Sequence, residues 1–320
     1  MRNKKIAFGS SFLEIVPLIF GGNVFGWTLD QPASFRILDE FTDSGFNAID
    51  TANSYSHWVP GNVGGESETI IGNWLTAHGG RENLVLMTKV GGRLSSERIY
   101  NTKGTYIKEQ VEHSLRRLKT DYIDLYQTHY DDEVTPIEET LRAYEDLLDE
   151  GKVRYIGVSN IKPERLVESL QIAKDQDLPN YISLQPEYNL YDRRHYELTL
   201  KPLVQEYDLA VIPYYSLASG FLSGKYFDES SFDQSARGQT IKDRYWNDRG
   251  HAVITGLTKV ARKYDASASA VALAWLLAQD TVTAPIASAT KSHHIGSFIQ
   301  ALLLQLEPED LAYLDEVSRY

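Results

Sequence analysis

The sequence predicts an α/β protein, a single (β/α)8 TIM barrel with an extended loop after the seventh strand and helices at the C-terminus. Two observations predict this fold. Eight short apolar runs recur along the 320 residues, and nearly all of them precede a longer amphipathic stretch. Such alternation is typical of parallel strands joined by crossover helices, and eight of these units close into a barrel. Since no linker or low-complexity segment interrupts the pattern, we expect one domain over residues 1–320.

The expected strands are short apolar runs bounded by polar or turn-forming residues. In chain order they are Val16–Phe20, Ala48–Asp50, Leu84–Lys89, Ile123–Gln127, Tyr155–Ser159, Ser183–Gln185, Ala210–Pro213 and Thr283–Ala287.

The expected helices follow the 3.6-residue period and carry start and stop signals. The helix over Pro136–Glu150 has Thr135 as its N-cap and ends before Gly151. The stretch Tyr226–Gly250 is polar and helix-poor, and its length is typical of a functional loop or lid. The other expected helices are Ser34–Ser44, Glu66–Ala77, Tyr106–Leu118, Lys162–Asp175, Lys201–Tyr207, His251–Tyr264, Ser269–Gln279, His294–Leu302 and Glu309–Val317.

Composition excludes several classes of function. The net charge of −12 argues against a general nucleic-acid binder, because such proteins present basic surfaces. The absence of cysteine excludes disulfides, thiolate catalysis and zinc–thiolate sites, and it suits a reducing cytosol. No apolar run is long enough to span a bilayer. We therefore expect an unprocessed cytoplasmic protein that binds neither nucleic acid nor membrane; the sequence sets no expectation for its oligomeric state.

The ends of the expected strands gather side chains that suit catalysis. In a barrel of this kind the active site forms at the C-terminal ends of the strands. Taken singly, Asp50 could cap a turn, Lys89 could be solvated and His129 could be structural. Together with Tyr55, however, they place a carboxylate, an ammonium, an imidazole and a phenol at one end of the barrel.

These groups fit together chemically without a metal. A phenol with a pKa near ~10 is a weak acid at neutral pH, and a neighbouring ammonium lowers that pKa. Asp50 could hold the Lys89 ammonium in place, so that Tyr55 could donate a proton to a developing alkoxide. His129 could orient the carbonyl oxygen. The pattern predicts general acid catalysis on a carbonyl group.

Five segments also carry a resemblance to a known family. They are Gly45–Tyr55, the G-x-x-E-x-x-x-G element over Gly65–Gly72, Leu118–His129, Gly151–Asn160 and the Q-x-x-Y-N element over Gln185–Asn189. Taken together, the sequence resembles the aldo-keto reductase superfamily, and the resemblance covers nearly the whole chain.

The resemblance implies a catalytic tetrad of Asp50, Tyr55, Lys89 and His129, with Tyr55 as the proton donor. It also implies NADPH bound in an extended form across the barrel mouth, without a Rossmann domain. In this binding mode, Ser159, Asn160 and Gln185 would hydrogen-bond the nicotinamide carboxamide, and Tyr214 would stack on the nicotinamide ring. Further cofactor residues would be Gly22, Asn23, Asp50 and, along the pyrophosphate, Leu217, Ser219, Gly220, Leu222, Gly224 and Lys225.

The 2′-phosphate of NADPH would lie beside Ser288, Thr290 and His294, with Lys291 nearby. Many family members carry Arg around His294 and Asn at the position of Phe298, so NADH stays open as the second choice. The segment Tyr215–Leu217 also departs from the Ser–Pro–Leu of many members, and we expect this to change the shape of the loop more than the chemistry.

The expected function is the NADPH-dependent reduction of aldehydes or ketones to alcohols. A non-catalytic, nicotinamide-sensing regulatory protein similar to a channel β-subunit is the alternative. A metal-dependent hydrolase is disfavoured because only His129 of the eight histidines lies at a strand end. A glycosidase is disfavoured because Asp50 is the one carboxylate that we place there. The substrate would be a small carbonyl compound held by Trp27, Tyr55, Trp58, His129 and Tyr130; Tyr245 and Trp246 could either join this pocket or pack within loops.

Overall fold

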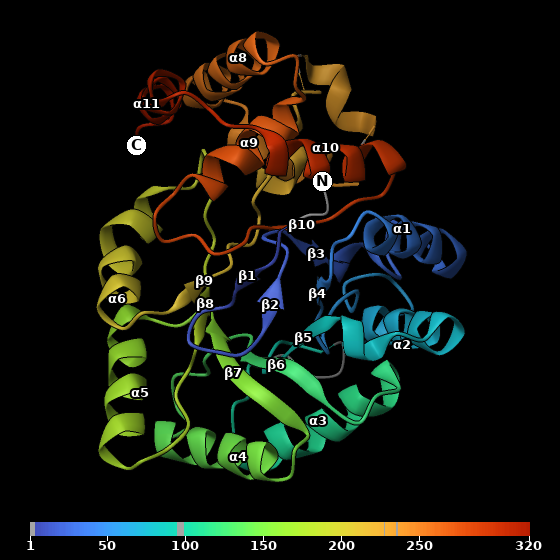
Figure 1. Ribbon diagram of the computed structural model, residues 1–320, viewed down its shortest axis with the longest axis vertical. Coiled ribbons are helices and arrows are strands. Elements are labelled where there is room, and N and C mark those ends of the chain that lie inside the picture. Colours follow the sequence, from blue (N-terminus) through green and yellow to red (C-terminus); the bar gives the residue numbers. More distant parts are fainter. Residues whose placement is uncertain (1–3, 95–98, 227, 235) are drawn as a thin grey trace.

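The computed structural model describes residues 4–94, 99–226, 228–234 and 236–320. Its central sheet consists of eight parallel strands that curl into a barrel in the order β10-β3-β4-β5-β6-β7-β8-β9 (Figure 1). Hydrogen bonds from Thr283 N to Val211 O (2.9 Å) and from Ile286 N to Pro213 O (2.9 Å) connect the two ends of this order. The expected (β/α)8 fold is confirmed. The strands are β3 (Ile19–Gly21), β4 (Ala48–Asp50), β5 (Val85–Val90), β6 (Ile123–Thr128), β7 (Val153–Ser159), β8 (Ser183–Gln185), β9 (Ala210–Val211) and β10 (Ile286–Ala287).

Helices surround the sheet and alternate with its strands (Figure 1). They are α1 (Gln31–Asp43), α2 (Glu66–His78), α3 (Gly104–Leu118), α4 (Ile137–Asp149), α5 (Pro163–Asp175), α6 (Lys201–Glu206), α7 (Gly238–Tyr245), α8 (Asp248–Lys263), α9 (Ala268–Leu277), α10 (Ser292–Leu303) and α11 (Pro308–Val317). None of the helices in the described part of the chain is both long and apolar enough to cross a bilayer.

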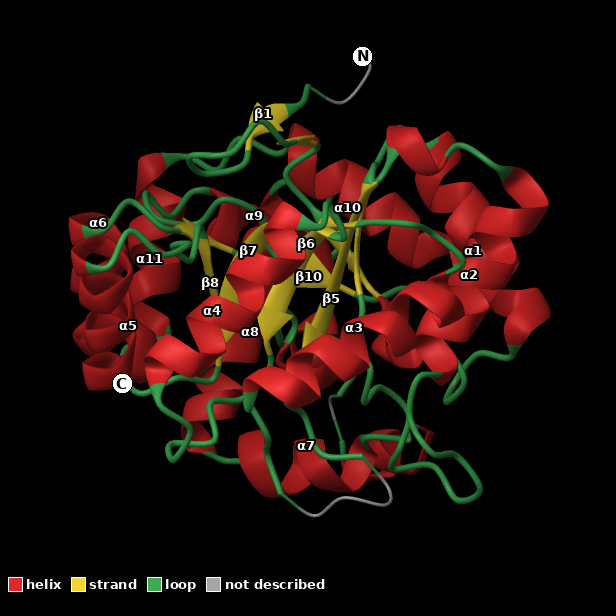
Figure 2. Cartoon of the chain, turned by 90° about the horizontal axis from the view of Figure 1, so that it is seen from below, coloured by secondary structure: helices red, strands yellow, loops and turns green. Residues whose placement is uncertain are grey.

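A short hairpin closes the N-terminal end of the barrel, which we call the base. Its strands β1 (Ile6–Ala7) and β2 (Glu14–Ile15) pair antiparallel. Phe8, Leu13 and Ile15 pack against the apolar residues of the barrel interior. The first barrel strand therefore begins at Ile19 rather than at the expected Val16, because Ile15 already belongs to the hairpin. Figure 2 shows β1 at one end of the sheet and α7 at the other, which we call the mouth.

Side chains that point into the barrel change from apolar at the base to polar at the mouth. Along β5, Val85 and Met87 belong to the apolar interior cluster, and Lys89 follows them two residues later. On β6, Gln127 follows Leu125 in the same way. Since alternate residues of a strand face the same side, the period that fills the core also brings Lys89 and Gln127 to the mouth.

Two local expectations are corrected. The stretch Tyr226–Gly250, expected to be helix-poor, contains α7 and the start of α8; positions 227 and 235 lie outside the described residues. Its helical signal is weak because α7 is mostly polar and buries only Gly238, Ile241 and Tyr245. Thr135 is not the N-cap of α4, because Pro136 takes that position and the Thr135 hydroxyl donates to Asp132 Oδ2 at 2.6 Å.

Candidate active site

Lys89 lies at the centre of a polar cluster at the mouth, in which Lys89 and Asp50 are buried and Tyr55 is half-buried. Its Nζ donates to Asp50 Oδ2 at 2.5 Å, to Tyr55 OH at 2.7 Å and to Thr51 O at 2.8 Å. The strands position the pair, since Asp50 ends β4, Lys89 lies near the end of β5, and these strands are neighbours. Tyr55 follows β4 in a loop. Lys89, which is far from both in the sequence, thus comes within hydrogen-bonding distance of Asp50 and Tyr55.

The cluster perturbs the acidity of its members. Burial lowers the pKa of Lys89, and the Asp50 carboxylate opposes that shift. Burial raises the pKa of Tyr55 well above its usual value, and the charge of Asp50 raises it further. From the sequence we expect the ammonium to lower the pKa of Tyr55, whereas in the structure desolvation dominates and raises it. Tyr55 consequently keeps its proton at neutral pH.

Two glutamine amides complete the surroundings of the Asp50 carboxylate. Gln127 Nε2 donates to Asp50 Oδ1 at 3.0 Å, and Gln185 Nε2 donates to the same oxygen at 3.1 Å. From the sequence, Gln127 is only the end of an expected strand. Because this strand is buried on both faces and Leu125 and Tyr126 are both apolar, its pattern alone does not tell that Gln127 faces the barrel interior.

His129 follows β6 and lies beside Tyr55. The centroids of the two rings are 5.8 Å apart, and Nδ1 lies 3.3 Å from Ser54 Oγ. Burial lowers the pKa of His129 well below its ordinary value, and the charges of Lys89 and His57 lower it further. The imidazole is therefore neutral at pH 7 and can act as a hydrogen-bond partner for a substrate oxygen.

A second hydrogen-bond chain follows β7 and β8. Tyr214 OH donates to Asn160 Oδ1 at 2.9 Å, and Asn160 Nδ2 donates to Ser159 Oγ at 2.9 Å. The Ser159 hydroxyl donates to Gln185 O at 2.8 Å. The four residues that the resemblance assigns to the nicotinamide are thus linked to one another beside the Lys89 cluster.

The segment after β9 has an unusual backbone. Ala218 (φ 47°), Ser219 (φ 58°) and Gly220 (φ 104°) adopt left-handed conformations in succession, and Gly224 (φ 78°) follows. Left-handed backbone is costly for residues other than glycine and tends to occur where function requires it. Leu217 and Ser219 are half-buried and Lys225 is exposed, while Leu222 is buried.

The residues expected around the 2′-phosphate lie after β10. His294 Nδ1 accepts from Thr290 N at 3.1 Å, and Ser288 Oγ donates to Asn23 Oδ1 at 2.7 Å. Burial lowers the pKa of His294 to about 4, with smaller contributions from His293, Lys225 and Lys291. The structure thus brings Lys225 and Lys291 close to His294. Gly22 starts the turn that carries Asn23, and a Cβ there would lie 2.9 Å from Ser67 Oγ.

Aromatic rings line one side of the mouth. Trp27 packs against Trp58, whose ring lies 6.3 Å from that of Tyr55, and Tyr130 lies 4.8 Å from His129. Arg237, which the sequence argument did not single out, lies 4.9 Å from the centroid of Trp27.

Two other aromatic residues belong to the packing of the loop. Tyr245 is fully buried, stacks on Phe221 and donates to Asp192, and Trp246 packs on Phe232 and His251.

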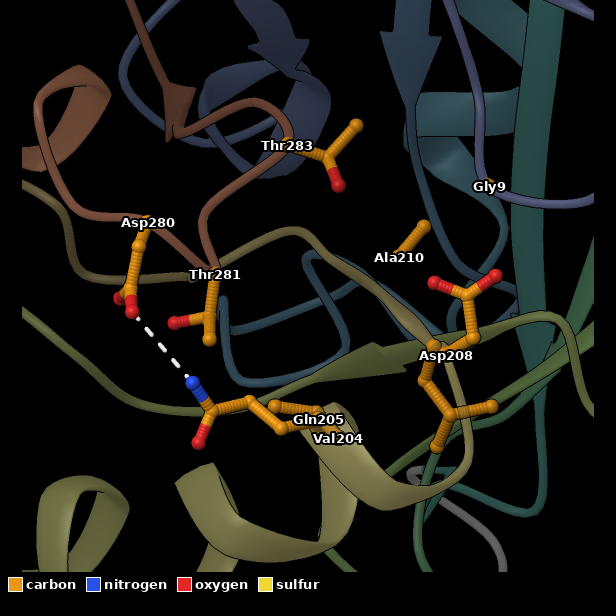
Figure 3. Close-up of a pocket in the computed structure, with 9 residues that line it drawn as sticks. Gly9, Val204, Gln205, Asp208, Ala210, Asp280, Thr281 and Thr283 are labelled. Carbon is orange, nitrogen blue, oxygen red and sulfur yellow. Dashed lines mark hydrogen bonds between the residues drawn. The ribbon is translucent and has the colours of Figure 1, made fainter.

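The base holds a pocket of a different kind (Figure 3). Gly9, Asp208, Asp280 and Thr283 line it, and Gln205 Nε2 donates to Asp280 Oδ2 at 3.3 Å. Asp280 also pairs with Lys201 at 2.7 Å. No cluster of three or more His, Cys, Asp or Glu side chains suited to a metal ion occurs among the described residues. The hydrogen-bonded cluster of Asp50, Tyr55 and Lys89 lies at the mouth, at the opposite end of the barrel from this pocket.

Comparisons with known proteins agree with this geometry. A sequence model described as the Aldo/keto reductase family matches residues 17–319. The oxidoreductase YrpG of Bacillus subtilis is 32% identical, covering 97% of this chain and 94% of its own length. A probable voltage-gated potassium channel subunit beta of Oryza sativa is 32% identical over 92% and 89% of the two chains. An aryl-alcohol dehydrogenase [NADP(+)] of Phanerodontia chrysosporium is 29% identical over 98% and 85%.

Proposed function

Because the chain belongs to the aldo/keto reductase family of oxidoreductases, we propose that it is an NADPH-dependent reductase that converts aldehydes and ketones to alcohols at the barrel mouth. One observation carries the proposal: Lys89 Nζ lies 2.5 Å from Asp50 Oδ2 and 2.7 Å from Tyr55 OH. A half-buried phenol beside a buried ammonium is suited to donate a proton to a nearby oxygen.

The residues at the mouth have the chemistry that would suit NADPH. Amides and hydroxyls of Ser159, Asn160 and Gln185 suit a carboxamide, and the ring of Tyr214 suits stacking on a flat heterocycle. Although the chain carries a net charge of −12, Lys225, Arg237 and Lys291 would supply cations to the phosphates of the cofactor. Bound NADPH would supply a hydride to the carbonyl carbon.

The protein would supply the proton and the polarisation. Tyr55 would donate its proton to the carbonyl oxygen while Lys89 stabilises the phenolate that remains. Asp50 would hold the ammonium in place, and the neutral His129 would hydrogen-bond the carbonyl oxygen. The raised pKa of Tyr55 supports this role, since the phenol is fully protonated before the reaction.

Preference for NADPH over NADH would come from Ser288, Thr290, Lys291 and His294. The cofactor in the name of the Phanerodontia dehydrogenase, NADP(+), supports this choice. Replacing His294 by Ala should weaken NADPH binding more than NADH binding in a fluorescence titration with both cofactors. Equal losses would argue against a contact with the 2′-phosphate.

The aromatic wall supports apolar carbonyl substrates. Trp27, Trp58 and Tyr130 would contact the part of the substrate that does not react, and such walls discriminate weakly, by ~1–3 kcal/mol per methylene. We therefore propose aldehydes, including aromatic ones, as the main substrates. A chain without cysteine suits a reducing compartment, and we propose that it works in the cytoplasm.

Removing one hydroxyl group tests the role of Tyr55. Tyr55→Phe should lower kcat for an aromatic aldehyde by ~10²–10⁴-fold, the usual contribution of general acid catalysis, with nearly unchanged NADPH affinity. Tyr155→Phe is the matched control at the base, where the Tyr155 hydroxyl accepts from Phe12 N at 3.1 Å. The rate of NADPH oxidation is followed by the absorbance of NADPH. If Tyr55→Phe oxidised NADPH at the wild-type rate, Tyr55 would not be the proton donor.

The similarity to the Oryza potassium channel subunit favours a second candidate, a regulatory protein that binds nicotinamide without turnover. A panel of aldehydes discriminates between the two. Steady oxidation of NADPH with at least one aldehyde supports the enzyme, whereas tight binding of NADPH without turnover across the panel supports the regulatory protein.

A further inference from the structure

Gln127 is fully buried and faces the barrel interior from β6, which lies between β5 and β7 in the sheet. In the register of the sheet, Gln127 lies opposite Lys89 on one side and Gly157 on the other. A Cβ at position 157 would lie 3.3 Å from Gln127 Cγ and would collide with Ser183 Oγ. A glycine at this place leaves the room that the Gln127 side chain needs, so neighbouring strands shape its position.

The amide of Gln127 takes part in a closed triangle of hydrogen bonds. Its Nε2 donates to Asp50 Oδ1 at 3.0 Å, and its Oε1 accepts from Gln185 Nε2 at 3.0 Å. Gln185 Nε2 also donates to Asp50 Oδ1 at 3.1 Å. Rotating either amide by 180° would place a carbonyl oxygen against an acceptor, so the triangle fixes the orientation of both amides.

This orientation has consequences on two sides. Asp50 Oδ1 is occupied by the two amides, so Oδ2 is the oxygen that meets Lys89 and Tyr55. With its Nε2 held by two acceptors, Gln185 turns its Oε1 away from Asp50. That oxygen is an acceptor of the kind that a carboxamide NH₂ group requires.

We propose that Gln127 is a positioning residue that couples the cofactor contact of Gln185 to the Asp50–Lys89–Tyr55 cluster. The contact of Gln185 with the cofactor rests on the proposed function, whereas the contact of Gln127 with Asp50 does not. Gln127 itself would touch neither substrate nor cofactor; it holds Gln185, which would contact the cofactor, and Asp50, which holds the Lys89 ammonium.

Gln127→Glu tests the proposal through its dependence on pH. A protonated glutamic acid has the shape of glutamine, donates through its O–H and accepts through its C=O, so it preserves the triangle. A deprotonated one places a second carboxylate against Asp50. Burial and this neighbouring charge raise the pKa of the introduced group in the folded protein above ~4.3. The folded state then binds the proton more tightly than the unfolded state, and stability falls as the pH rises through the folded pKa.

The first measurement uses the protein without cofactor. Relative to wild type, Gln127→Glu should show a deficit in Tm that grows by at least ~5 °C from pH 5 to pH 8. A deficit that stays constant over this range would overturn the contact with Asp50, whether or not the protein reduces carbonyls.

The second measurement is the Kd for NADPH, determined by fluorescence titration at each pH. The ratio of Kd between Gln127→Glu and wild type should rise about 10-fold from pH 5.5 to pH 8, and the ratio of kcat should fall in parallel. A ratio of Kd that does not change while the Tm deficit grows would overturn the coupling through Gln185.

Two further variants separate the network from packing. Gln127→Met keeps the length of the side chain but cannot hydrogen-bond, so its deficit relative to wild type should be the same at every pH. Thr128→Val, one residue along the strand, breaks the 2.7 Å bond to Tyr144 OH on the other face of the sheet. It should lower Tm while leaving the Kd ratio unchanged with pH; a rising ratio in either variant would contradict the proposal.

Discussion

The two ends of the barrel each bury an aspartate against cations, yet the two sites differ in kind. At the mouth, Asp50 pairs with Lys89 at 2.5 Å, and both side chains are buried. Near the base, Asp124 lies close to the start of β6, where its two oxygens bind Arg81 at 2.8 Å and Arg154 at 2.9 Å. Asp124 Oδ2 also accepts from Leu86 N at 2.9 Å.

The cations make the difference. The guanidinium groups of Arg81 and Arg154 each lie 4.0 Å from the ring centroid of Tyr122 and remain partly exposed to water. Lys89 has no exposed surface, its pKa is lowered by burial, and it donates to a phenol. A buried ion pair by itself therefore does not indicate catalysis; the feature that supports the proposed catalysis at the mouth is the hydrogen bond from the buried ammonium to the Tyr55 hydroxyl.

Among the changes to these two ion pairs, Lys89→Met should have the largest effect on activity. Removing the ammonium leaves the Tyr55 phenolate without its stabilising charge, so kcat should fall about 10³-fold, which corresponds to ~4 kcal/mol in the transition state. Steady-state turnover of an aldehyde measures the loss, and near-UV circular dichroism shows whether the variant is folded.

Arg81→Met is the matched change near the base. It removes a cation from a buried carboxylate as well, but Asp124 keeps Arg154. Activity per folded molecule should stay within a factor of about 2. A comparable loss of kcat in both variants would show that the two ends do not differ as described.

Asp124→Asn should have a smaller effect, and on stability instead of turnover. The amide can replace only one of the two acceptor oxygens, so either Leu86 N or an arginine loses its partner. We expect the free energy of unfolding in urea to fall by about 2 kcal/mol, within the usual cost of an unsatisfied buried group. Asp121→Asn, an exposed change three residues earlier, should stay within ~0.5 kcal/mol. A loss of kcat in Asp124→Asn with unchanged stability would contradict a structural role.

The same contrast shows how far the sequence could lead. Strand ends placed Asp50, Lys89 and His129 at the mouth, because a barrel collects the C-terminal ends of its strands. Gln127 was missed because periodicity alone does not tell which face of a buried strand points inward until its partners are known. Position 124 lies on that same strand, and the sequence does not distinguish its structural carboxylate from a catalytic one.

Helix α7 shows a second limit. Only Gly238, Ile241 and Tyr245 of its residues are buried, so tertiary contacts stabilise a segment with little amphipathic pattern of its own. The glycines of the Gly65–Gly72 element, in contrast, have a plain structural reason. A side chain at Gly65 or Gly72 would collide with Arg117, whose Nε donates to the buried Glu68 at 2.7 Å.

Acid should destabilise the folded protein through His294 at the mouth, and this is the smallest effect that we expect. The pKa of His294 is lowered to about 4 in the folded protein, while an unfolded histidine titrates near ~6.5. Between these values the unfolded state binds the proton and the folded state does not, so stability falls as the pH drops. His294→Gln cannot be protonated, and from pH 7 to pH 5 its Tm should fall by about 1–2 °C less than that of wild type. His113→Gln, an exposed change on α3, should follow wild type. If both variants lost Tm equally with acid, the buried imidazole at the mouth would not be the source of the difference.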